Sequence, residues 1–113
     1  MTTAKLVRIL LVEDDEASAV IFREHAASVS DGEYLIFRAT NLSEAFDELK
    51  NAPFDVMFLD LGLPPLSPLE TMATVAKADV NLPVIVLTGN ASPEVRMQAA
   101  ALEFHDCMSK DDL

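Results

Sequence analysis

The sequence VMFLD at residues 56–60 decides the fold, because four consecutive apolar residues end in a carboxylate. Such a run is too short for a helix, and continuous apolarity is typical of a strand buried on both faces of a parallel sheet. The same pattern recurs as ILLV at residues 9–12 and VIVL at residues 84–87, each followed by a polar residue. We therefore expect three buried strands here, and two further strands at 34–39 and 105–109.

Sequences that favour helices fill the gaps between these strands. Asn41 followed by Glu44 predicts a helix start with a capping box, and Ser67-Pro68 followed by Glu70 predicts another. The positions expected to face the core are Ser18, Ile21, Phe22, His25 and Val29 in the first helix; Leu42, Ala45, Phe46 and Leu49 in the second; Leu69, Met72, Ala73 and Ala76 in the third; and Val95, Ala99 and Leu102 in a fourth that begins at Ser92-Pro93.

Strands and helices thus alternate along a chain whose 113 residues suit one domain, spanning 1–113. Alternating units form a parallel sheet with helices on both faces and right-handed crossovers, which is a doubly wound α/β fold. Ligand sites in such sheets lie beyond the carboxyl ends of the strands. The polar residues that this rule gathers at one edge are Glu13, Asp14, Asp60, Thr88 and Lys110.

The charge balance argues against some classes of partner. The chain has 19 acidic and 8 basic residues, a formal net charge of −11 at pH 7, which repels nucleic-acid backbones and anionic membranes. Its single cysteine, Cys107, excludes an internal disulfide, and its N-terminal apolar stretch is too short for a signal peptide or a membrane span. We therefore expect a cytoplasmic domain with no nucleic-acid or membrane partner.

The carboxylates at the expected sheet edge point to a cation. Like charges a few ångströms apart repel one another unless a cation or a raised pKa relieves them. Mg²⁺ prefers oxygen ligands and is usually held by one or two carboxylates together with a phosphate. The hydroxyl of Thr88 and the ammonium of Lys110 suit the oxygens of a phosphoryl group. The set therefore favours phosphoryl transfer to Asp60 as nucleophile.

Four motifs at these strand ends resemble the receiver domain of two-component response regulators, the CheY-like family. They are VEDD at 12–15, LDLGLP at 59–64, LTG at 87–89 and DCMSK at 106–110, and together they span nearly the whole chain. The resemblance implies a flavodoxin-like sheet of five parallel strands in the order 2-1-3-4-5. It also implies that Asp60 takes a phosphoryl group from a histidine kinase or phosphotransfer protein, and that the domain catalyses only its own phosphorylation and dephosphorylation.

The resemblance also implies a role for each polar residue at the matching positions. The implied Mg²⁺ ligands are Asp14 and Asp60 directly, Glu13 through water, and the backbone carbonyl of Gly62. Thr88 and Lys110 would bind the phosphoryl oxygens. Gly62 and Asn90 occupy positions that resemble those tuning hydrolysis of the acyl phosphate in the family.

The sequence departs from the usual pattern of the family at several positions. Cys107 stands where most receivers have an aromatic residue that moves with the threonine, so we expect weak coupling of Thr88 to the fourth helix. Glu103 stands where a glycine usually ends that helix, so we expect a differently shaped helix end. A fifth helix is absent before Leu113, so we expect a second protomer, a partner or further residues to cover an apolar flank.

Two other functions fit parts of the sequence. A phosphohydrolase of the haloacid dehalogenase type also uses an aspartyl phosphate, but it has a second aspartate two residues after the nucleophile, where this chain has Gly62. A phosphorylation-independent interaction or dimerisation module would share the fold, but such modules usually lose the nucleophile, an acidic ligand or the lysine. We therefore expect a phosphorylatable receiver that signals through a protein interaction surface.

Overall fold

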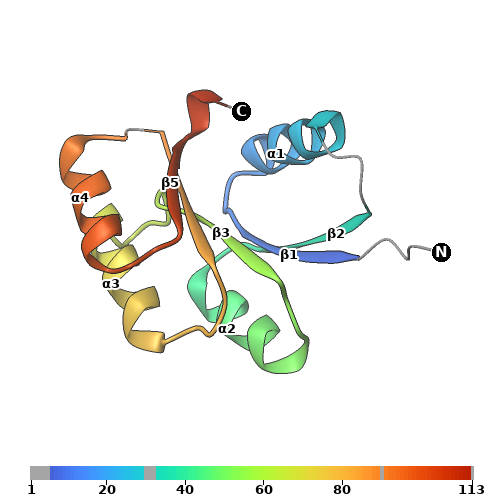
Figure 1. Cartoon of the computed structure of the whole chain (residues 1–113), viewed down its shortest axis with the longest axis horizontal. Helices are drawn as coiled ribbons and strands as arrows, with labels where there is room; N and C mark the ends of the chain where they lie inside the picture. Colours follow the sequence, from blue (N-terminus) through green and yellow to red (C-terminus); the bar gives the residue numbers. More distant parts are fainter. Residues whose placement is uncertain (1–5, 30–32, 90, 113) are drawn as a thin grey trace.

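Five parallel strands form one sheet in the order β2-β1-β3-β4-β5 in the computed structural model, which describes residues 6–29, 33–89 and 91–112 (Figure 1). The strands are β1 (Val7–Val12), β2 (Tyr34–Ala39), β3 (Val56–Asp60), β4 (Val84–Thr88) and β5 (Asp106–Ser109). The helices are α1 (Glu16–Val29), α2 (Leu42–Asn51), α3 (Pro68–Ala78) and α4 (Pro93–Ala101), and a 3₁₀ turn spans Lys110–Asp112. This confirms the doubly wound fold and the expected strand order.

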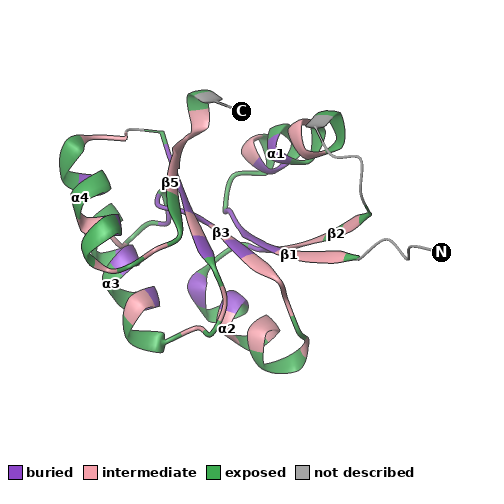
Figure 2. Ribbon diagram, in the orientation of Figure 1, coloured by how far each residue is buried: buried purple, intermediate pink, exposed green. Residues whose placement is uncertain are grey.

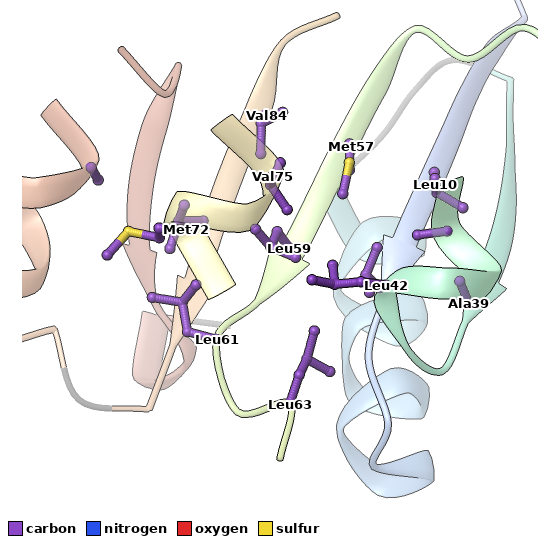
Figure 3. Close-up of a cluster of buried hydrophobic side chains, with 14 of the residues drawn as sticks. Leu10, Ala39, Leu42, Met57, Leu59, Leu61, Leu63, Met72, Val75 and Val84 are labelled. Atoms are coloured by element: carbon purple, nitrogen blue, oxygen red, sulfur yellow. The ribbon is translucent and has the colours of Figure 1, made fainter. Parts of the chain in front are cut away.

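Helices cover both faces of the sheet, with α1 on one side and α2, α3 and α4 on the other (Figure 1). Successive residues of a strand point to opposite faces, so Leu10 enters the core under α2–α4 while Leu11 enters the core under α1. The inner strands are buried most completely (Figure 2). Figure 3 shows the larger core, in which Met57 and Leu59 of β3 lie among side chains from α2 and α3.

The expected caps begin three of the helices. Ser67 and Glu70 form the predicted capping box, with Glu70 N–H donating to Ser67 Oγ and Ser67 N–H donating to Glu70 Oε1. Asn41 Oδ1 accepts from the N–H of Glu44, but the Glu44 carboxylate reaches one residue further back and accepts from Thr40. Asn41 is therefore confirmed as the N-cap of α2. The predicted capping box is wrong in one contact, because the Glu44 carboxylate binds Thr40 and not the N–H of Asn41. Ser92 caps α4 as expected.

Two of the predicted apolar stripes are partly wrong. The buried residues of α3 are Thr71, Met72 and Val75, whereas the sequence pattern predicts Leu69, Met72, Ala73 and Ala76. Thr71 enters the core because its hydroxyl donates to the carbonyl of Ser67, which satisfies its polar atom. In α1, Phe22 is buried and His25 half-buried, but Ile21 is 51% exposed. The side chain of Val29 lies outside the described residues.

The end of α4 corrects another expectation. Glu103 adopts the left-handed conformation that a glycine usually takes at this position, with φ of 61°, although a differently shaped helix end was expected. Its N–H donates to the carbonyl of Ala100, and the N–H of Phe104 donates to the carbonyl of Ala99. These two bonds make the Schellman motif that usually has a glycine at this position. The helix end is therefore shaped in the usual way, at a conformational cost that a glycine would avoid.

Candidate functional site

Two neighbouring strands bring three carboxylates together at the carboxyl edge of the sheet. Strand β1 ends just before Glu13 and Asp14, and β3 ends on Asp60; the parallel register pairs Val12 with Leu59, so Glu13 and Asp60 follow side by side. One carboxylate oxygen from each of the three residues lies within 4.8 Å of the others. Glu13 and Asp60 are each only 2% exposed, whereas Asp14 is exposed.

This donor set fits a hard divalent cation. Its oxygens are close enough for one ion to contact more than one of them, and Mg²⁺ is typically held by one or two carboxylates while it keeps several waters. Because Asp14 is exposed, the cluster opens to solvent on one side. The sequence-based expectation that these three residues gather at the edge is confirmed by their positions.

Lys110 provides the positive charge among these acids. Lys110 is the first residue after β5. Its Nζ lies 2.7 Å from Glu13 Oε1 and 3.0 Å from Asp60 Oδ1. Both carboxylate side chains in these ion pairs are almost fully buried, while the lysine side chain is 25% exposed. The long-range contact predicted for Lys110 with the edge of the sheet therefore exists.

The crowding of these charges changes how they titrate. Burial raises the pKa of Glu13 to about 7, and the neighbouring Asp60 adds to the increase while Lys110 opposes it. Burial lowers the pKa of Lys110, but its contacts with Glu13 and Asp60 outweigh burial, so that the net pKa is raised. One lysine thus serves two buried carboxylates, which leaves the site short of positive charge.

Thr88 and Gly62 lie beside the same cluster. Thr88 ends β4 and is buried, and it follows Leu87, the partner of Asp60 in the register between β3 and β4. A Cβ at Gly62 would lie 3.4 Å from Asp60 Oδ2, so Gly62 borders the carboxylate directly. Asn90, the other expected tuning position, lies outside the described residues.

Sequence reasoning missed Arg38. Its Nε donates to the carbonyl of Glu13 at 2.9 Å, and its Nη2 donates to the carbonyl of Asp14 at 3.0 Å. A single arginine in a strand has no neighbouring sequence motif that predicts hydrogen bonds to the carbonyls of Glu13 and Asp14. The signal lies in the sheet order, because β2 runs parallel beside β1 and places Arg38 opposite Leu11, near the end of that strand.

Comparisons with known proteins identify a family and similar folds. The model of the family described as "Response regulator receiver domain" matches residues 9–112. The cell cycle transcriptional regulator CtrA of Caulobacter vibrioides is 30% identical over 105 residues, which cover 92% of this chain and 44% of that protein. The chain therefore spans less than half the length of this relative.

Solved structures share the fold. A CheY-like response regulator receiver domain protein from Methanospirillum hungatei has a TM-score of 0.74 at 24% identity, with 94% of this chain and 82% of that chain covered. The Mn²⁺-bound form of response regulator Rcp1 has a TM-score of 0.75 at 24% identity, with coverages of 91% and 80%. Among the described residues, no helix has the length and apolarity that crossing a membrane requires.

Proposed function

Because the chain belongs to the response regulator receiver family of two-component systems, we propose that it accepts a phosphoryl group on Asp60 in a Mg²⁺-dependent reaction. The observation that carries the proposal is the position of Lys110 Nζ between two buried carboxylates, 3.0 Å from Asp60 Oδ1, beside the exposed Asp14. Buried carboxylates that share one lysine favour the arrival of further positive charge.

The proposed chemistry begins with the Asp60 carboxylate. One of its oxygens attacks the phosphorus of a phosphohistidine in a histidine kinase or phosphotransfer protein. The new O–P bond forms as the P–N bond breaks, and the leaving imidazole nitrogen keeps the electron pair of that bond. No net proton needs to leave Asp60, because it reacts as the carboxylate.

The remaining residues stabilise charge and hold geometry. The Lys110 ammonium, which is paired with the free Asp60 carboxylate, pairs with a phosphoryl oxygen after the transfer. The Thr88 hydroxyl donates a hydrogen bond to a second phosphoryl oxygen. Asp14, Asp60 and the carbonyl of Gly62 are the proposed direct ligands of Mg²⁺, and Glu13 acts through water. When bound, Mg²⁺ neutralises the negative charge that accumulates on the phosphoryl oxygens.

The proposed output is binding of another protein, with no catalysis beyond the phosphorylation and dephosphorylation of Asp60. The net charge of −11 supports the expectation that the domain itself binds no nucleic acid and lies on no anionic membrane. A cytoplasmic location follows the same proposal, because that is where phosphohistidine donors of two-component systems act.

Incubation with a small-molecule phosphodonor and Mg²⁺ tests the proposal, with intact-mass measurement of the product. We expect a gain of one phosphoryl group that disappears in Asp60→Asn and persists in Asp47→Asn, an exposed aspartate on α2 that serves as the matched control. The gain should also disappear in EDTA. If no donor produces a gain in the wild type, the alternative of a phosphorylation-independent interaction module takes precedence.

A further inference from the structure

Arg38 holds the chain at the point where the two acidic residues leave the sheet. The N–H of Glu13 donates to the carbonyl of Ala39 at 2.9 Å, which extends the pairing of β1 with β2 (Figure 1). The carbonyl of the same residue accepts from Arg38 Nε, and the carbonyl of Asp14 accepts from Nη2 of the same guanidinium. One rigid, planar group therefore contacts two successive carbonyls.

These two contacts define the direction of one side chain. The carbonyl of Glu13 belongs to the peptide plane before the Asp14 Cα, and the carbonyl of Asp14 belongs to the plane after it. Peptide units are planar, so fixing both carbonyls fixes the two dihedral angles between the planes. The direction of the Asp14 Cα–Cβ bond then follows from the backbone.

Asp14 needs such support more than its neighbours do. Glu13 and Asp60 are buried and paired with Lys110, whereas the Asp14 carboxylate is exposed and makes no hydrogen bond or ion pair with the described part of the chain. The next residue is held separately, because Asp15 accepts hydrogen bonds from the N–H and the hydroxyl of Ser18 in the first turn of α1.

We propose that Arg38 is a positioning residue of the cation site, which aims the Asp14 carboxylate at the metal through the backbone. The inference rests on the proposed function, because it takes the three carboxylates as the Mg²⁺ site. Arginine suits the task because its guanidinium presents several N–H donors in a fixed plane, which a lysine ammonium does not. Partners that orient metal ligands typically change metal affinity by 10–100-fold when they are removed.

The positive charge of Arg38 and its two hydrogen bonds to the backbone have opposite effects on the affinity for Mg²⁺. A cation near the site repels Mg²⁺, so loss of the charge alone would tighten metal binding. Loss of the two carbonyl contacts would weaken it. The sign of the change in affinity therefore separates a positioning role from a purely electrostatic one.

Calorimetric titration of Mg²⁺ into wild type, Arg38→Met and Arg23→Met provides the test. Arg23 is an exposed arginine of α1, so its variant controls for the change in net charge. We expect Arg38→Met to bind Mg²⁺ about tenfold more weakly, and Arg23→Met to bind like the wild type. Equal or tighter binding by Arg38→Met overturns the inference. A wild type that does not bind Mg²⁺ at all overturns the proposed cation site instead.

A measurement without metal distinguishes positioning from general loss of structure. Amide hydrogen exchange, followed by NMR in EDTA, should become faster at Asp14 and Asp15 in Arg38→Met and stay unchanged in the core strand β4. Unchanged exchange at both amides overturns the inference. If Arg38→Met does not fold, Arg38→Gln serves in its place, because it keeps one donor nitrogen in place of the guanidinium and loses the positive charge.

Discussion

Lys110 Nζ lies 2.7 Å from Glu13 Oε1, so a residue that follows the last strand is paired with the residue that follows the first. The same ammonium contacts Asp60 at 3.0 Å. Because this lysine is the shared partner of two buried carboxylates, its removal affects both stability and affinity for cations. The first prediction separates these two effects.

Lys110→Met should destabilise the metal-free protein by about 2 kcal/mol, less than for a fully buried pair because the lysine is partly exposed. The physical cause is the loss of the positive charge beside Glu13 and Asp60. Added Mg²⁺ should recover most of the loss, since the ion supplies charge at the same place. Urea unfolding with and without Mg²⁺ measures both values. Lys77→Met, on the exposed surface of α3, is the matched control and should show no such rescue.

The stability of the metal-free protein should fall as the pH rises from about 4.5 to about 7. Burial raises the pKa of Glu13 from 4.5 to about 7, so the folded protein holds this proton more tightly than the unfolded chain does. The stabilising contribution is therefore complete below 4.5 and is lost as Glu13 ionises. Carboxylates with lowered pKa values, such as Asp15 and Glu44, act in the opposite direction and below this range.

Thermal unfolding in EDTA at pH 5 and pH 7.5 measures this dependence. We expect a decrease of several degrees in the wild type and a much smaller one in Glu13→Gln, which cannot ionise. An equal decrease in both proteins would show that another group is responsible. With saturating Mg²⁺ the decrease should shrink, because the cation stabilises the ionised form of the site.

Glu103→Gly should stabilise the protein by about 1 kcal/mol. Glu103 has φ of 61° at the end of α4, a conformation that costs a residue with a Cβ more than it costs glycine. Glu103→Ala removes the charge and keeps the Cβ, so it is the matched control and should bring no comparable gain. Urea unfolding midpoints compare the three proteins, and a gain in the alanine variant would assign the effect to charge.

The apolar flank on the α1 side should be covered by a second protomer, by another protein or by further residues of the chain. Ile21 is 51% exposed there, and Phe58 and Met108 are only partly buried against the smaller core. Size-exclusion chromatography with light scattering tests the case of a second protomer. An increase in mass with concentration that Ile21→Glu abolishes would support it, and a monomer at high concentration would reject it.

Phosphorylation should change the position of α4 only slightly. Cys107 is a small, half-buried side chain packed against the larger core, and its carbonyl accepts a hydrogen bond from Arg96 of α4 at 3.3 Å. No large ring is available at this position to follow a movement of Thr88. Structures with and without beryllofluoride would test this expectation, and a large rearrangement of α4 in the bound form would contradict it.

Most of the fold could be predicted from the sequence because its signals are local. Short apolar runs indicated the inner strands, and side chains such as Ser67 and Ser92 marked the helix starts. Ligand sites of parallel sheets lie beyond the carboxyl ends of the strands, and this rule predicted that the carboxylates lie together without any knowledge of distances. These signals depend on neighbours in the chain, and they agree with the tertiary structure.

The errors have causes that a pattern of apolar residues does not record. Apolarity alone could not predict that Thr71 enters the core, because its hydroxyl is satisfied by a carbonyl one turn earlier. Ile21 belongs to a helical stripe that meets the sheet only in part, so its exposure depends on what else covers that flank. Arg38 acts on residues more than twenty positions away in the chain, and only the register of β1 with β2 reveals the contact.

The ion pair between residues 13 and 110 also has a consequence for the order in which the site is assembled during synthesis. Chains are synthesised from the N-terminus, so the acidic residues and Asp60 leave the ribosome well before Lys110 does. A contact across 97 positions cannot form until nearly the whole domain has been made. A chain that has not yet reached Lys110 therefore carries Asp60, the proposed acceptor, without the lysine beside it, and the complete set of charges at the site forms only after residue 110 has been added.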